Sequence, residues 1–141
     1  MASVFTKVIS GEFPGHFVWK DDKAVVFMTI QPIRDGHVLV VPREEVDHWD
    51  DLPPELLAHL TRVSQKVTKA LKEAYPAKRV GMMIAGLEVP HTHIHLVPLD
   101  NMGDLSFDHA RNAEPERLAA AATKIREVLL AQGHDEARVD G

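Results

Sequence analysis

The sequence predicts an α+β fold, in which an antiparallel five-stranded sheet carries helices that are segregated from the strands rather than alternating with them. Two observations predict it. Short apolar runs between turn residues indicate strands near residues 17–41 and 80–97, whereas apolar residues three and four positions apart indicate helices after residues 53 and 115. Strands joined mostly by short turns, with helices kept apart, are typical of an α+β domain.

The first half of the chain predicts a short helix followed by three strands. Ser3 can cap a helix that carries Val4, Phe5, Val8 and Ile9 and ends at Gly11. Residues 17–20 and 24–30 predict a hairpin around the turn at 21–23. Residues 37–41 predict a third strand that is stopped by Pro42.

The second half predicts a long helix, two more strands and a last helix. The apolar stripe over residues 56–74 indicates the long crossover helix, which starts near Pro53–Glu55 and ends at Pro76. Strands are expected at 80–85 and 91–97, a loop at 101–113, a helix at 115–131 and a frayed tail at 135–141. We expect residues 1–110 to form one domain, and residues 111–141 to be a C-terminal helix and tail packed on or extending it.

Composition excludes several classes of function. The 16 basic and 21 acidic residues give a net charge of −5, which argues against binding a nucleic-acid backbone. The sequence has no apolar run long enough to span a membrane and no secretory signal, so a cytoplasmic location is expected. It also has no cysteine, which excludes disulfides, thiolate catalysis and cysteine-ligated zinc.

The segment His91-Thr92-His93-Ile94-His95 is the most informative part of the chain. Alternate residues of a strand share one face, so the segment predicts three imidazoles side by side. Imidazole acts as nucleophile, acid, base or metal ligand near neutral pH. Three on one face therefore predict a functional site.

Two chemistries remain open from the spacing alone. The histidines could bind zinc, with Glu88 or Asp100 completing or orienting the ligand set. Alternatively, the middle histidine could attack phosphorus while its neighbours donate to the phosphate oxygens and the leaving group.

A fourth histidine extends the pattern: His37 follows a glycine turn and begins an apolar strand. With it, the chain resembles the histidine triad (HIT) family of nucleotide hydrolases and transferases, such as the bacterial Hint-like and Fhit-like proteins, over roughly residues 3–100. The resemblance rests on residues 4–14, Asp21-Asp22, Pro32, residues 36–42, residues 51–54 and the triad with Leu96-Val97-Pro98.

The resemblance implies a role for each of these histidines. His93 would be the nucleophile that takes the nucleotidyl group from the α-phosphate, and His91 and His95 would contact phosphate and handle protons. His37 would support the triad from the neighbouring strand. The positions implied to bind the nucleotide are Phe5, Phe27, Thr29, Ile30, Leu39, Glu88 and Val89.

The resemblance also implies a fold, a substrate class and an assembly. Residues 1–110 would be a HIT domain that joins its sheet to that of a second copy in a homodimer. The substrate would be a purine nucleotide conjugate, either a phosphoramidate or a dinucleoside polyphosphate. No metal or other cofactor would take part, and neither nucleic acid nor a membrane would be a partner.

Three departures from the family pattern bear on activity. Relatives often carry a zinc-binding Cys-x-x-Cys where this chain has Val4-Phe5-Thr6-Lys7, and an acidic ribose-binding residue where it has Thr29. In the loop at 85–90, Glu88 stands near the position of a polar phosphate-contacting residue. These departures leave an alternative function open, namely a nucleotide-binding or scaffold protein with little turnover.

Overall fold

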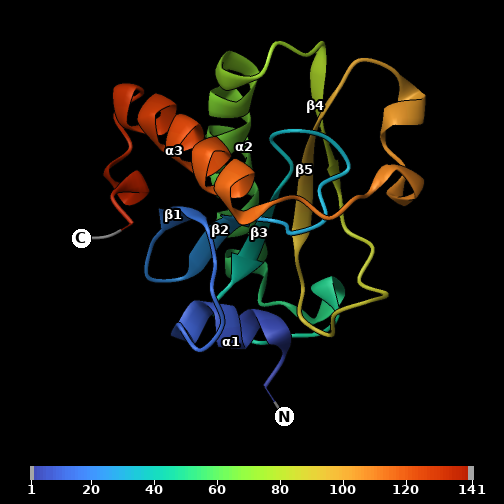
Figure 1. Ribbon diagram of the computed structural model, residues 1–141. Helices are drawn as coiled ribbons and strands as arrows, with labels where there is room; N and C mark the ends of the chain where they lie inside the picture. The colour runs from blue at the N-terminus through green and yellow to red at the C-terminus, as the bar shows by residue number, and fades with distance from the viewer. Residues whose placement is uncertain (1, 140–141) are drawn as a thin grey trace.

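The computed structural model describes residues 2–139, which form one antiparallel five-stranded sheet in the order β1-β2-β3-β5-β4 (Figure 1). The strands are β1 (Phe17–Lys20), β2 (Ala24–Met28), β3 (Val38–Pro42), β4 (Arg79–Met83) and β5 (Ile94–Leu99). The longer helices are α1 (Val4–Ser10), α2 (Pro54–Ala74) and α3 (Pro115–Ala131). The predicted α+β class and sheet are confirmed.

Helix α2 is the crossover between β3 and β4. Since β5 pairs antiparallel with both of these strands, it fills the position between them and leaves β4 at the edge of the sheet. The predicted apolar stripe of α2 is buried, including Leu60, Val67 and Leu71. The late return of β5 to the middle of the sheet brings His95 beside β3.

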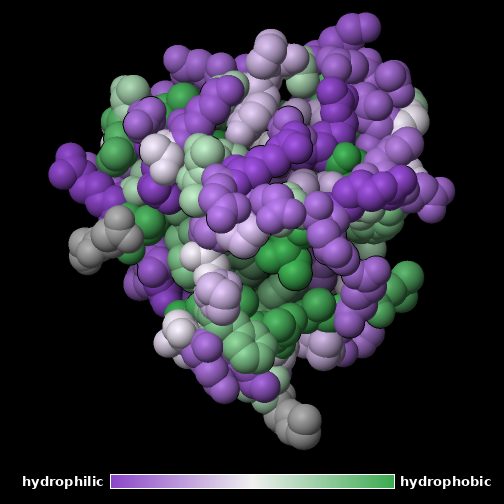
Figure 2. Space-filling view, in the orientation of Figure 1, coloured by the Kyte–Doolittle hydropathy of each residue, from purple (hydrophilic) through white to green (hydrophobic). Residues whose placement is uncertain are grey.

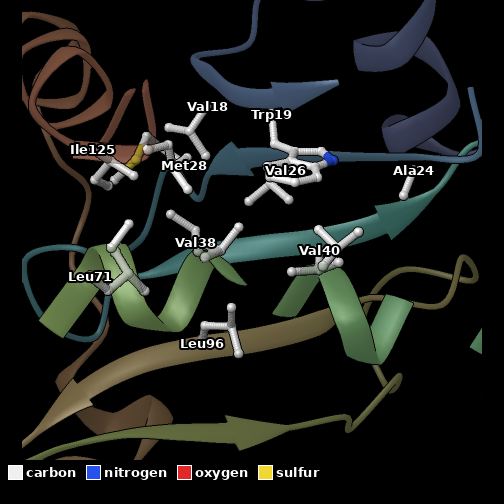
Figure 3. Packing of buried hydrophobic residues seen from close by; sticks show 14 of the residues in the cluster. Val18, Trp19, Ala24, Val26, Met28, Val38, Val40, Leu71, Leu96 and Ile125 are labelled. Carbon is white, nitrogen blue, oxygen red and sulfur yellow. The ribbon is translucent and has the colours of Figure 1, made fainter. Parts of the chain in front are cut away.

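The two faces of the sheet carry different cores. Val26, Val40 and Leu96 point toward α2 and α3, where they pack in the main core (Figure 3). Phe27 and Leu39, at alternate positions, point to the other face and pack against Phe5 of α1. His95 lies directly opposite Leu39 in the β3–β5 register. The end of the triad therefore lies on the α1 face.

The start of the last strand differs from the prediction. β5 begins at Ile94, and His91, Thr92 and His93 precede it rather than lying within it. The reason is a change of hydrogen-bond partners: the N–H of His91 donates to the carbonyl of Val89, and that of Thr92 to the carbonyl of Val46. The ladder with β3 starts only at Ile94.

Other boundaries shift by a few residues. The strand predicted at 24–30 ends at Met28, the one at 37–41 runs from Val38 through Pro42, and the one at 80–85 runs from Arg79 to Met83. The tail is not frayed at 135–137, because Asp135–Ala137 forms a 3-10 turn and Ala137 is buried in the main core. Residues 140–141 lie outside the described residues.

Helix α3 shares the main core with the sheet through Leu118, Ala122, Ile125 and Leu129. The proposed division at residue 110 stays a prediction. Among the helices formed by residues 2–139, none combines the length and the apolar character needed to cross a membrane.

Candidate active site

The four histidines form a continuous group at the junction of β3 and β5. His37 directly precedes β3, and His95 is the second residue of β5. The ring centroids of His37 and His95 lie 5.2 Å apart, and those of His93 and His95 lie 4.9 Å apart. His91 lies at the other end of the group, with Phe5 against both His91 and His93.

His91 is enclosed by the protein. Its side chain is 0% exposed, and Nε2–H donates to the carbonyl of Pro42 across 2.8 Å. That bond leaves Nδ1 as an acceptor in the neutral ring, where it receives the hydroxyl hydrogen of Ser3 across 2.7 Å. With both nitrogens bonded, this geometry does not support the expectation that His91 contacts phosphate.

His93 has the tautomer of a nucleophile. Its Nδ1–H donates to the backbone carbonyl of His91 across 2.7 Å. A neutral imidazole carries one N–H, so the bond fixes the proton on Nδ1 and the lone pair on Nε2.

The hydrogen bonds of His37 and His95 all run in one direction, from the backbone of Ile33 through His37 to His95. The backbone N–H of Ile33 donates to Nδ1 of His37 across 2.9 Å, so the proton of His37 lies on Nε2. Nε2–H of His37 then donates to Nδ1 of His95 across 2.9 Å. His95 is therefore an Nε2–H tautomer, with a donor at the nitrogen that faces away from His37.

Two imidazole nitrogens remain open to a ligand. Within residues 2–139, every buried side-chain nitrogen or oxygen has a hydrogen-bond partner. Nε2 of His93 and Nε2 of His95 take part in no hydrogen bond among these residues, so both must reach solvent. The site thus presents an acceptor with a lone pair beside a fixed donor.

The protein keeps these rings neutral. Burial lowers the pKa of His37 to about 3 and that of His95 to about 4, and neighbouring histidines add to both shifts. Burial also lowers the pKa of His93, against the bond to the His91 carbonyl and the negative charge of Glu88. At neutral pH His93 therefore keeps its lone pair.

Three polar residues that the sequence did not reveal as site residues support His91. Oε1 of Glu45 accepts from the N–H of Ser3 across 2.7 Å and from the hydroxyl of Thr6 across 2.6 Å. Ser3 also caps α1, as predicted, by accepting from the N–H of Thr6. The hydrogen bond from Ser3 to His91 spans 88 residues of sequence, so no local sequence pattern predicts it.

The structure gathers four of the expected nucleotide-binding residues. Phe5, Phe27 and Leu39 are buried in one cluster, and half-buried Val89 packs against it. Phe5 meets the His93 ring edge-on at 4.8 Å between centroids. In Figure 2, apolar side chains gather above α1 and are bordered by hydrophilic residues. An apolar cluster thus lies against the ring of His93.

The other expected nucleotide-binding residues lie farther out. Ile30 is 67% exposed beyond the end of β2, and the hydroxyl of Thr29 accepts from the N–H of Gln31. Glu88 is exposed, in the loop before the triad, where its charge acts on His93. Nothing in these contacts assigns a ligand to any of the three.

Phe107 is a site residue that sequence reasoning missed. It lies in the 3-10 turn Phe107–His109, and its ring meets that of His95 edge-on at 5.1 Å between centroids. The surrounding segment is rich in Asp and Gly, so the sequence indicated only a loop.

The positions of the histidine rings do not favour the alternative in which the triad binds zinc. No group of three or more His, Asp or Glu side chains within residues 2–139 is arranged to hold a metal ion. His91 has no free nitrogen, and His93 and His95 each use Nδ1 in a bond to the protein. At most two nitrogens of the triad are thus open.

A separate cleft of about 550 Å³ lies between the loop at 32–35 and the start of α3, lined in part by Arg34, Tyr75 and Arg117. It contains none of the triad histidines. Of its three arginines, Arg34 pairs with Asp100 and Arg117 with Asp35, whereas Arg111 donates to the backbone carbonyls of Asp108 and Ala110. The histidine chemistry therefore lies outside this cleft.

Comparison with known proteins shows where the sequence is shared. The sequence model of the HIT domain matches residues 10–102. An uncharacterized HIT-like protein from Borreliella burgdorferi is 32% identical over 131 residues, which cover 86% of this chain and 94% of that protein. Adenosine 5'-monophosphoramidase HNT1 from Saccharomyces cerevisiae is 32% identical over 98 residues, covering 69% of this chain and 62% of that enzyme.

Solved structures agree with the sequence comparison. A HIT-like protein from Bartonella henselae, described as involved in cell-cycle regulation, has a TM-score of 0.80 at 30% identity, covering 89% of this chain and 95% of that one. A Zn-bound histidine triad family protein from Mycobacterium smegmatis has a TM-score of 0.81 at 28% identity, covering 94% and 96%. Both similarities extend beyond residue 102, through most of the chain.

Proposed function

Because the chain belongs to the histidine triad family, we propose that it is a hydrolase or nucleotidyl transferase that acts at the α-phosphate of a purine nucleotide conjugate. The conjugate is a phosphoramidate or a dinucleoside polyphosphate. A yeast relative that is named an adenosine 5'-monophosphoramidase supports the first of these.

The observation that carries the proposal is the state of His93. Its proton is fixed on Nδ1 by the His91 carbonyl, and Nε2 reaches solvent with its lone pair. The lowered pKa keeps that lone pair free at neutral pH. A neutral, oriented imidazole nitrogen is what attack on phosphorus requires.

The reaction runs in two displacements. Nε2 of His93 forms a bond to the α-phosphorus as the bond to the leaving atom breaks, and the leaving atom departs with the bonding pair and takes a proton from solvent. Water then attacks the nucleotidyl-histidine, gives up a proton to solvent, and returns the electron pair to Nε2. The products are a nucleoside monophosphate and the free leaving group.

His95 acts as a fixed hydrogen-bond donor in this scheme. Its Nδ1 already accepts from His37, so its Nε2–H is the group that stabilises charge on the phosphoryl oxygens or the leaving atom. A second proton on Nδ1 would face the N–H of His37, and burial together with the neighbouring His93 lowers the pKa of His95 to about 4, so the ring stays neutral. His91 acts as a positioning residue, because its carbonyl holds the tautomer of His93.

The apolar cluster beside the nucleophile would hold the nucleoside. Phe5, Phe27 and Leu39 form an aromatic and aliphatic cluster, buried within the protein, against which a flat base would pack. Thr29 offers a hydroxyl near the end of β2, where relatives carry an acidic residue.

We further propose a homodimer that joins two sheets at β4. This strand is one of the two edges of the sheet, and its Met82 is 56% exposed. An edge strand offers unpaired N–H and C=O groups to a second copy. A cytoplasmic location stays a prediction, as does the absence of membrane and nucleic-acid partners.

Turnover of an adenosine phosphoramidate by wild type and by His93→Ala tests the proposal. We expect the variant to lose turnover by about a thousandfold or more while it still binds the nucleotide, because the role of the imidazole is covalent. His48→Ala, at an exposed histidine, is the matched control and should keep wild-type turnover. Near-wild-type turnover in His93→Ala would contradict the mechanism. If the wild-type protein binds the nucleotide but does not turn it over, the result would favour the scaffold alternative.

A further inference from the structure

Phe107 lies beside the chemistry, but neither displacement uses it. Its ring is 44% exposed, whereas His95, which it contacts, is 7% exposed. A single exposed aromatic residue is ordinary on a protein surface. An exposed ring in contact with the histidine that carries the open donor is in a position to touch a ligand.

The segment that carries Phe107 is fixed in place. Arg34 binds Asp100 across 3.0 Å and Asp104 across 2.5 Å, one guanidinium nitrogen to each carboxylate. Farther along, the N–H of Ala113 donates to the carbonyl of Ile30 across 3.1 Å. The segment at 100–113 is therefore held at both ends by the loop that precedes His37.

The order of the rings distinguishes two sides of the triad. Phe5 lies 4.8 Å from His93, His93 lies 4.9 Å from His95, and His95 lies 5.1 Å from Phe107, all between ring centroids. Phe5 belongs to the apolar cluster that would hold the nucleoside. Phe107 stands beyond His95, at the opposite end of this series.

With the nucleoside packed at Phe5 and the α-phosphorus at Nε2 of His93, the nucleoside takes the Phe5 side of His93, and the side with His95 and Phe107 is left for the leaving group. The matched HIT domain ends at residue 102, so Phe107 lies outside the shared segment that contains the four histidines. That placement suits a residue that selects the leaving group rather than one that performs the reaction.

We propose that Phe107 forms an apolar wall for the leaving group, so that the protein prefers nucleoside phosphoramidates whose amine carries an aromatic or aliphatic face. The inference rests on the proposed function and narrows its substrate class. An amine bonded to the α-phosphate next to His95 packs its apolar face against the exposed ring. Ammonia, the smallest leaving group, reaches His95 without touching that ring.

Two substrates and two variants test this selection. The substrates are adenosine 5'-phosphoramidate, which releases ammonia, and its N-phenyl derivative, which releases aniline. For each substrate, kcat/KM of Phe107→Ala is divided by the wild-type value, which cancels the intrinsic reactivity of the leaving group. Met102→Ala, in the same segment and 87% exposed, is the matched control.

We expect Phe107→Ala to lose about tenfold in kcat/KM on the N-phenyl substrate and to stay near wild type on the unsubstituted one. Phe107→Leu should lose less, and Met102→Ala should change neither value. Equal losses on both substrates would show that Phe107 only supports His95, and no loss on either would show that it does not contact the leaving group. Both results overturn the inference. Failure of the wild type to cleave either substrate would instead reject the phosphoramidate form of the proposed function, on which the inference rests.

Discussion

The two outer histidines of the triad stand two residues on either side of His93, yet the protein holds them differently. His91 is 0% exposed and has both nitrogens bonded, to Ser3 and to the carbonyl of Pro42. His95 is bonded on one side, to His37, and open on the other. The same residue type therefore meets a closed polar network at one end of the triad and a ligand-accessible surface at the other.

This difference shows that position in a motif does not assign a role. The spacing of the triad presents His91 and His95 as equivalent neighbours of the nucleophile. Their bonds separate them: the carbonyl of His91 fixes the tautomer of His93, whereas the His37–His95 chain aims a donor outward. Stability should depend more on the first histidine, and reaction with a ligand more on the second.

The largest difference is expected in the free energy of unfolding. His91→Ala leaves a buried cavity and removes the partners of Ser3 and the Pro42 carbonyl, and it should cost about 3 kcal/mol. His95→Ala should cost about 1 kcal/mol, because water can reach the freed Nε2–H of His37 through the open side of the site. Urea unfolding at pH 7 measures both. A cost for His95→Ala equal to or above that of His91→Ala would contradict the contrast drawn between them.

Acid should also lower the free energy of unfolding. The folded-state pKa is about 3 for His37 and about 4 for His95, below the unfolded value of 6.5. Between these values the unfolded chain binds more protons than the folded one, so acid favours unfolding. The stability is fully present above about pH 6.5 and is lost as the pH falls toward 4 and then 3.

Urea unfolding at pH 7.5, 6.5 and 5.5 checks this dependence. Below pH 6.5, the free energy of unfolding should fall by up to about 1.4 kcal/mol per pH unit for each histidine that gains a proton on unfolding. Carboxylates with lowered pKa values, such as Asp21 held by Trp19, affect stability only at lower pH. A free energy that stays constant or rises from pH 7.5 to 5.5 would show that the histidine chain is not held neutral.

Local pattern was enough to predict most of the regular elements. The stripe of α2 and the cap at Ser3 depend on residues within a few positions of each other, and both are present in the structure. Alternation also predicted that histidines two residues apart lie side by side, and the rings of His93 and His95 do so although β5 begins later than expected.

Contacts between distant segments account for what the sequence did not reveal. β5 starts late because the backbone of Thr92 bonds to Val46, far away in the chain. The bond from Ser3 to His91 and the contact of Phe107 with His95 likewise depend on the folded arrangement. Ala137, in a tail expected to be frayed, is buried because the turn after α3 brings it into the main core.

The stereochemical course at phosphorus tests the central claim most directly, because it does not require the intermediate to accumulate. A substrate with a chiral α-thiophosphate is hydrolysed in ¹⁸O-labelled water, and the configuration of the nucleoside phosphorothioate product is determined. Two in-line displacements, first by Nε2 of His93 and then by water, each invert phosphorus, so the account predicts net retention. Net inversion would show that water attacks the substrate in one step and would contradict the nucleotidyl-histidine mechanism.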